Sequence, residues 1–146
     1  TRCDIKSISL LPNILAKQAA AEAKAFEAWL VGPDGTVTEG SSTNAWIVKD
    51  GAVITYPKGH DILGGITRLS LLDLAAKTGA KLVERSFTLN EALGADEAFL
   101  TSSSAFILPV TTIDGHKIGN GMPGPITQQL RQIYVENVAR QVKAAS

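Results

Sequence analysis

Between residues 27 and 56 the sequence repeats one pattern, a short apolar segment followed by a turn. Segments 27–31, 36–39, 45–49 and 52–56 have the length and the apolar content of strands. "GPDG" at 32–35 and "KDG" at 49–51 separate them, and tight turns prefer glycine and aspartate. The pattern therefore predicts successive short strands with at least one hairpin, so this part of the chain is expected to build a sheet.

Helices are predicted on both sides of this region. Residues 14–26 are rich in alanine, with Leu15, Ala19 and Ala23 at helical spacing and Asn13 near the N-cap. A second helix is predicted over 67–78, and an amphipathic helix over 127–143 ends the chain. The alanine-rich helix is expected to pack closely on a sheet.

Further strands are predicted at 2–10, 81–86, 97–102 and 108–113, with 114–125 as a loop. Thr88 and Glu91 have the spacing of a capping box for a short helix that ends near Gly94. The mixture of hairpins and scattered helices predicts one α+β (mixed α/β) domain.

The composition argues against several classes of binding partner. The 146 residues suit one core, and 14 basic against 14 acidic residues give no net field for nucleic acid or an anionic membrane. The longest apolar stretches fall far short of the roughly 20 residues of a spanning helix. The single cysteine, Cys3, cannot form an intramolecular disulfide, which fits a cytoplasmic protein. His60 and His116 lack a second histidine at ligand spacing, so no metal site is predicted.

Two segments offer donors for an anion. "LGGITR" at 63–68 places glycines ahead of a helix, where backbone N–H groups can approach a phosphate, although such glycines more often only form turns. The serines at 102–104 end a predicted strand and supply hydroxyls, or they form a plain loop. Both interpretations stay open for each segment.

Two of the charged residues on predicted strands are candidates for a chemical role. Lys6 shares a strand face with apolar residues, either because its stem covers apolar surface while its amine reaches water, or because the amine has a chemical role. Glu39 ends a strand before small residues that permit close backbone approach. A solvated carboxylate explains Glu39 equally well when it is taken alone.

Together these segments resemble the class IV aminotransferases, pyridoxal-phosphate enzymes of fold type IV. The family's signature is matched by "EGSSTNAWIVKDGAVITYPKGHDILGGITR" at 39–68. Trp46 departs from the usual Phe or Tyr but keeps an aromatic ring, and Phe106 stands where relatives often carry Glu. "RCDIKSISLLPN" at 2–13 most resembles the D-amino-acid aminotransferases of the family.

The resemblance implies a role for each matching position. Lys6 would be the catalytic Schiff-base lysine, and Glu39 would face the pyridine nitrogen of pyridoxal 5′-phosphate. The remaining cofactor-binding residues would hold its ring and phosphate: Leu63, Gly65, Ile66, Thr67, Ser102 and Ser103.

The resemblance also implies an architecture and an activity. Residues 1–146 would be the larger, C-terminal cofactor-binding domain, a pseudo-barrel of mixed sheets with flanking helices, and the small N-terminal domain would be missing from this chain. The expected activity is transamination between a D-alanine-type amino acid and a 2-oxo acid by a cytoplasmic homodimer. Alternatives are an R-amine or branched-chain aminotransferase, an aminodeoxychorismate lyase, or an inactive folded or oligomerising module. The chain alone is expected to have little or no activity.

Overall fold

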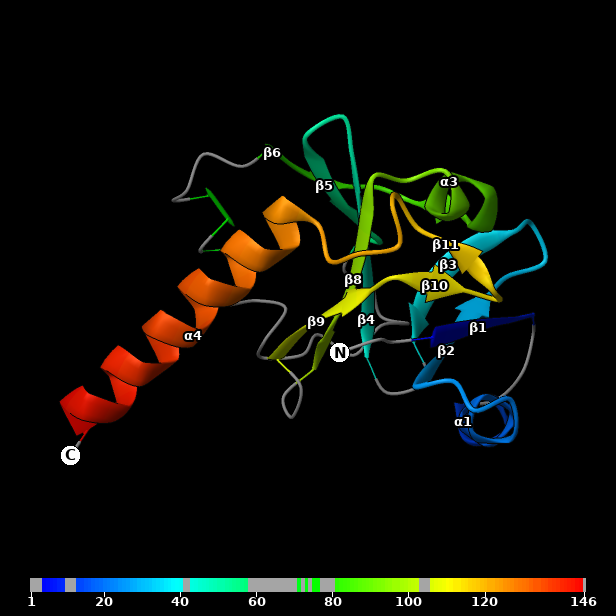
Figure 1. Ribbon diagram of the computed structural model, residues 1–146, viewed down its shortest axis with the longest axis horizontal. Helices are drawn as coiled ribbons and strands as arrows, with labels where there is room; N and C mark the ends of the chain where they lie inside the picture. The colour runs from blue at the N-terminus through cyan, green and yellow to red at the C-terminus, as the bar shows by residue number, and fades with distance from the viewer. Residues whose placement is uncertain are drawn as a thin grey trace.

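Two mixed β-sheets form the body of the protein (Figure 1). The computed structural model describes residues 4–9, 13–40, 43–57, 71, 73, 75–76, 81–102 and 106–145. For Glu39 and some residues at the ends of these segments it describes the backbone alone. The predicted α+β class is confirmed.

The first sheet has six strands in the order β11-β10-β1-β2-β3-β7. Its central strand β1 (Asp4–Ser9) runs parallel to both β10 (Thr112–Ile113) and β2 (Glu27–Val31). The other pairings in this sheet are antiparallel. Its remaining strands are β3 (Thr36–Gly40), β7 (Phe87–Thr88) and β11 (His116–Lys117).

The second sheet has five strands in the order β6-β5-β4-β8-β9. β4 (Asn44–Lys49) and β5 (Ala52–Thr55) form the predicted hairpin. Asp50 and Gly51 turn the chain there with φ angles of 52° and 79°, in the left-handed region that such turns require. The sheet is completed by β6 (Lys81–Glu84), β8 (Glu97–Ser102) and β9 (Phe106–Val110).

The main core contains apolar side chains from both sheets. Ile5 and Trp29 come from the first sheet, and Ile47 and Leu100 come from the second. Because strand side chains alternate between faces, each sheet also has an outer face that needs its own cover.

Helices cover these outer faces (Figure 1). α1 (Asn13–Glu22) packs Ala16 and Ala20 against Ala28 of the first sheet. α4 (Pro125–Ala145) packs on the second sheet, and its C-terminal end extends away from the body in Figure 1. The cluster under α4 includes Leu130, Tyr134, Trp46, Phe99 and the helical residues Leu71 and Ala75. No helix in the described part of the chain is long and apolar enough to cross a bilayer.

The predicted short helix is confirmed at α3 (Leu89–Leu93). Thr88 and Glu91 make both hydrogen bonds of the capping box, and Gly94 is the C-cap. Residues 71, 73, 75 and 76 are helical, as predicted, whereas both predicted ends of that helix lie outside the described residues.

Three predictions of the elements were wrong in part. α1 ends at Glu22, and Lys24 takes a left-handed φ of 59°, so the helix does not continue to residue 26. The strand predicted over 108–113 is divided between the two sheets, because β9 ends at Val110 and β10 begins at Thr112. The predicted loop 114–125 contains β11, which pairs with β10.

Candidate functional site

Lys6 lies on the outer face of β1. Ile5 packs in the core between the sheets, whereas Ile8 packs against the α1 cluster, and alternation places Lys6 on the same face as Ile8. Lys6 is half-buried and lies opposite Ala28 in the parallel ladder. It lines a cavity of about 350 Å³, a size within the range of small-molecule sites. Other described residues that line this cavity include Ala23, Ala25, Thr112 and Asp114.

The backbone on both sides of Lys6 is fixed by the turn that follows β10. The Asp114 N–H donates to the Ile5 carbonyl over 2.6 Å. The Ser7 N–H donates to Asp114 Oδ1 over 3.0 Å, and the Ser7 hydroxyl donates to Oδ2 of the same carboxylate. No sequence signal identified this contact, because its partners lie 107 residues apart.

Glu39 occupies a nearby position in the same sheet. It pairs with Leu30 of β2, and Leu30 pairs with Ile8 of β1. Because neighbouring strands are about 4.8 Å apart, the backbones of β1 and β3 are separated by roughly 10 Å across β2. The strands that carry Lys6 and Glu39 therefore lie on either side of β2. The Glu39 side chain lies outside the described residues.

A second carboxylate near this region was not predicted. Glu27 begins β2 and is only 2% exposed. Its Oε2 accepts a hydrogen bond from the Thr43 hydroxyl at 3.0 Å, and Oε1 accepts one from the Ala28 N–H at 2.9 Å. The sequence signal that could have identified Glu27 is an acidic residue at the first position of an apolar strand. The pair connects β2 to the segment just before β4.

Ser102 is the one predicted phosphate ligand that the structure describes. It is half-buried at the end of β8, opposite Phe106. Its neighbour Thr101 is fully buried and accepts a hydrogen bond from Trp46 Nε1 at 2.9 Å. The other predicted ring and phosphate residues lie outside the described residues: Leu63, Gly65, Ile66, Thr67 and Ser103.

The two departures from the family pattern are accommodated by packing. Trp46 is fully buried and stacks on Phe99 with ring centroids 5.4 Å apart. Phe106 has a left-handed φ of 57°, and its ring contacts Tyr134 of α4 with centroids 5.5 Å apart. An aromatic side chain at 106 therefore helps to attach the last helix.

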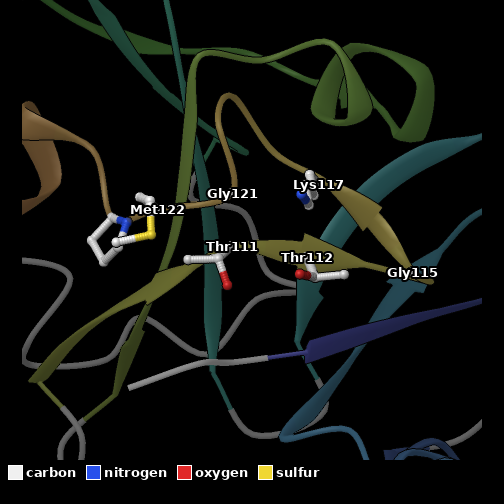
Figure 2. A pocket seen from close by; sticks show the side chains of 7 residues that line it. Thr111, Thr112, Gly115, Lys117, Gly121 and Met122 are labelled. Carbon is white, nitrogen blue, oxygen red and sulfur yellow. The ribbon is translucent and has the colours of Figure 1, made fainter.

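A second cavity of about 380 Å³ is lined by residues of the β10–β11 hairpin and of the segment that follows it (Figure 2). Figure 2 shows Thr111, Lys117 and Met122 around it. Thr112 and Gly115 line both cavities, so both adjoin this hairpin. None of the predicted cofactor residues in the described part of the chain lines this second cavity.

The chain belongs to the amino-transferase class IV family, whose pattern matches residues 1–113. It is similar to the D-alanine aminotransferase of Bacillus licheniformis, with 48% identity over 130 residues, which are 89% of this chain and 46% of that protein. It is also 46% identical to the D-alanine aminotransferase of Listeria monocytogenes over 139 residues, or 95% of this chain and 48% of that protein. The chain thus spans about half the length of these curated relatives.

Solved structures confirm the fold. The branched-chain amino acid aminotransferase of Thermobaculum terrenum, in its PLP form, matches with a TM-score of 0.85 and 34% identity over 94% of this chain and 51% of its own. The branched-chain aminotransferase of Thermoproteus uzoniensis, solved with norvaline, matches with a TM-score of 0.84 and 31% identity over 91% of this chain and 50% of its own. The predicted fold type IV architecture is therefore confirmed.

Proposed function

We propose that this chain is the cofactor-binding part of a pyridoxal-phosphate aminotransferase that exchanges an amino group between a D-alanine-type amino acid and a 2-oxo acid. The observation that carries the proposal is the position of Lys6, which is half-buried and lines a cavity of about 350 Å³. The identity of 48% to a D-alanine aminotransferase supports the donor class.

The described groups suit this cofactor chemically. Lys6 supplies an amine for covalent attachment. Ser102, at the end of β8 in the second sheet, supplies a hydroxyl and an N–H. Glu39 lies on β3, two strands from Lys6, where a carboxylate would face the pyridine nitrogen. The phosphate would be held by Ser102 with Gly65, Ile66, Thr67 and Ser103, and the ring by Leu63. When bound, the cofactor supplies an electron sink for the bond cleaved at the substrate Cα.

The residues of the chain would then supply positioning and proton transfer. The Lys6 amine would hold the cofactor covalently, and when free, its Nζ would accept the proton that leaves the substrate Cα and donate it to the cofactor. The Glu39 carboxylate would stabilise the positive charge of the protonated ring nitrogen. The partly buried position of Lys6 limits water around the amine, which strengthens each of these electrostatic contacts.

The rest of the active site would come from other parts of the protein. We propose that residues 1–146 form a C-terminal domain, that an N-terminal domain completes the substrate pocket, and that the enzyme is a cytoplasmic homodimer. The span of about half of each relative supports a second domain. A second candidate activity, branched-chain amino acid transamination, is supported by the structural neighbours at 31% and 34% identity.

The proposal is tested with the complete protein, loaded with pyridoxal 5′-phosphate and assayed with D-alanine, L-leucine, an (R)-amine and aminodeoxychorismate as separate donors. D-alanine is expected to give the highest kcat/KM. Lys6→Ala is expected to lower transamination by roughly 100- to 10,000-fold, because it removes the transferring base. Faster turnover of L-leucine than of D-alanine would favour branched-chain amino acids over D-alanine as the donor class. Unchanged activity of Lys6→Ala would overturn the role of Lys6.

A further inference from the structure

The turn between β10 and β11 contacts the strand that carries Lys6. Asp114 and Gly115 form this turn with φ angles of 49° and 81°. Two successive residues in the left-handed region give a hairpin turn whose twist suits the flanking strands, and aspartate tolerates that conformation better than most residues. Figure 2 shows the end of β10 and the start of β11 meeting at Gly115.

The turn continues the edge of β1 where strand pairing stops. The parallel ladder between β1 and β10 pairs Asp4 with Thr112 and Ile5 with Ile113, and β10 ends there. In a regular ladder the next residue of β10 would supply a backbone acceptor for β1. Instead, the Asp114 carboxylate accepts the Ser7 N–H at 3.0 Å.

Asp114 therefore holds β1 immediately before and after Lys6. Its N–H binds the Ile5 carbonyl at 2.6 Å, and its two carboxylate oxygens bind the N–H and the hydroxyl of Ser7. Hydrogen bonds to a charged acceptor are stronger than neutral ones, so this attachment resists local movement of the strand. The same residue also lines the cavity that contains Lys6.

We propose that Asp114 is a positioning residue that fixes the direction in which the Lys6 side chain leaves β1. The inference rests on the proposed function, because it assigns the purpose of the attachment to the cofactor-bearing amine. Without the carboxylate, Ser7 loses two hydrogen bonds, so the side of β1 that faces β10 is held less firmly just after Lys6, while the pairing with β2 remains. A displacement of about 1 Å in a reacting group is sufficient to lower turnover by roughly 100-fold.

The test compares three variants of the complete, cofactor-loaded protein. Asp114→Gly removes the carboxylate and keeps the left-handed turn, and Asp114→Asn keeps an oxygen acceptor in the same place. Asp50→Gly is the matched control, because Asp50 and Gly51 form an equivalent turn, with φ angles of 52° and 79°, in the other sheet. The readouts are kcat and KM, and the rate at which Lys6 attaches cofactor when the apoprotein is mixed with pyridoxal 5′-phosphate.

Asp114→Gly is expected to slow attachment and lower kcat by at least about 10-fold while KM for the donor stays within about twofold. Asp114→Asn should recover most of both rates, and Asp50→Gly should match the wild type. Equal rates in Asp114→Gly and Asp50→Gly would overturn the inference. If Asp114→Gly does not fold, Ser7→Ala takes its place, with slower attachment expected and an unchanged rate contradicting the inference. Lys6→Ala separates the two claims: cofactor attachment in that variant would refute the proposed function itself, whatever Asp114 does.

Discussion

The buried carboxylate of Glu27 accepts a hydrogen bond from the Thr43 hydroxyl at 3.0 Å, and this contact joins the start of β2 to the segment that enters β4. Glu27 is 2% exposed and Thr43 is 9% exposed, so water cannot readily replace either partner. The contact therefore links the two sheets close to the strand that carries Glu39.

Thr43→Val tests this link. The substitution keeps the shape of the side chain and removes the hydroxyl that donates to the buried Glu27 carboxylate. We expect a loss of about 1–3 kcal/mol in the free energy of unfolding, measured by urea denaturation. Thr43→Ser retains the hydroxyl and is expected to lose less than half as much. A loss in Thr43→Ser with no loss in Thr43→Val would show that the methyl group, rather than the hydrogen bond, stabilises this position.

Gly124 is predicted to tolerate no side chain. A Cβ atom there would collide with Glu97 Cδ, and Glu97 accepts hydrogen bonds from the Ile126 and Thr127 N–H groups at the start of α4. Gly124→Ala is therefore expected to destabilise the protein by about 1–3 kcal/mol in chemical denaturation, because the carboxylate must leave these amides.

The matched control for Gly124 is Gly94. A Cβ at Gly94 would approach its nearest atom, the Asn90 carbonyl oxygen, at an ordinary 3.7 Å. Gly94→Ala should change stability by less than about 1 kcal/mol, because the unfolded chain loses freedom while the fold accepts the methyl group. A loss as large as that of Gly124→Ala would contradict the close contact with Glu97.

The capping box of α3 gives a pH-dependent prediction. The Glu91 carboxylate accepts hydrogen bonds from Arg85 Nη2 at 2.9 Å and from the Thr88 N–H at 3.2 Å. The Arg85 side chain, and to a smaller extent the Thr88 amide, hold the pKa of Glu91 below its ordinary value of 4.5. A pKa that is lowered by folding stabilises the fold above the unfolded pKa, and this contribution disappears as the pH falls through the folded pKa.

Glu91→Gln should therefore be less stable than the wild type at neutral pH. The difference in stability should shrink as the pH falls below the pKa of an ordinary glutamate. Thermal unfolding of both proteins across the acidic range measures this. Thr88→Ala, which removes the other half of the box, is expected to lose about 1 kcal/mol at neutral pH. A stability difference for Glu91→Gln that grows toward acid would contradict the assignment.

Local signals predicted local structure well. The capping box at Thr88 and Glu91 and the hairpin at Asp50 depend on neighbouring residues, and both are confirmed. The apolar patterns also placed Lys6 and Glu39 on strands, where the structure has them. Positions within a few residues of each other were sufficient for these predictions.

Long-range pairing was not predictable in the same way. The strand expected over 108–113 divides at Thr111 because Val110 pairs with Ala98 in one sheet, whereas Thr112 pairs with Asp4 in the other. β11 has two exposed residues and no apolar pattern, so only its pairing with β10 defines it. The contact between Asp114 and Ser7 needs both of these features.

The most direct test of the account is to locate the residue that binds the cofactor. The complete protein, loaded with pyridoxal 5′-phosphate, is reduced with borohydride, digested and analysed by peptide mass spectrometry. The proposed function predicts a single phosphopyridoxyl group on the peptide that contains Lys6, and none on that peptide after treatment with D-alanine before reduction. A modification at another lysine, with Lys6 unmodified, would contradict it.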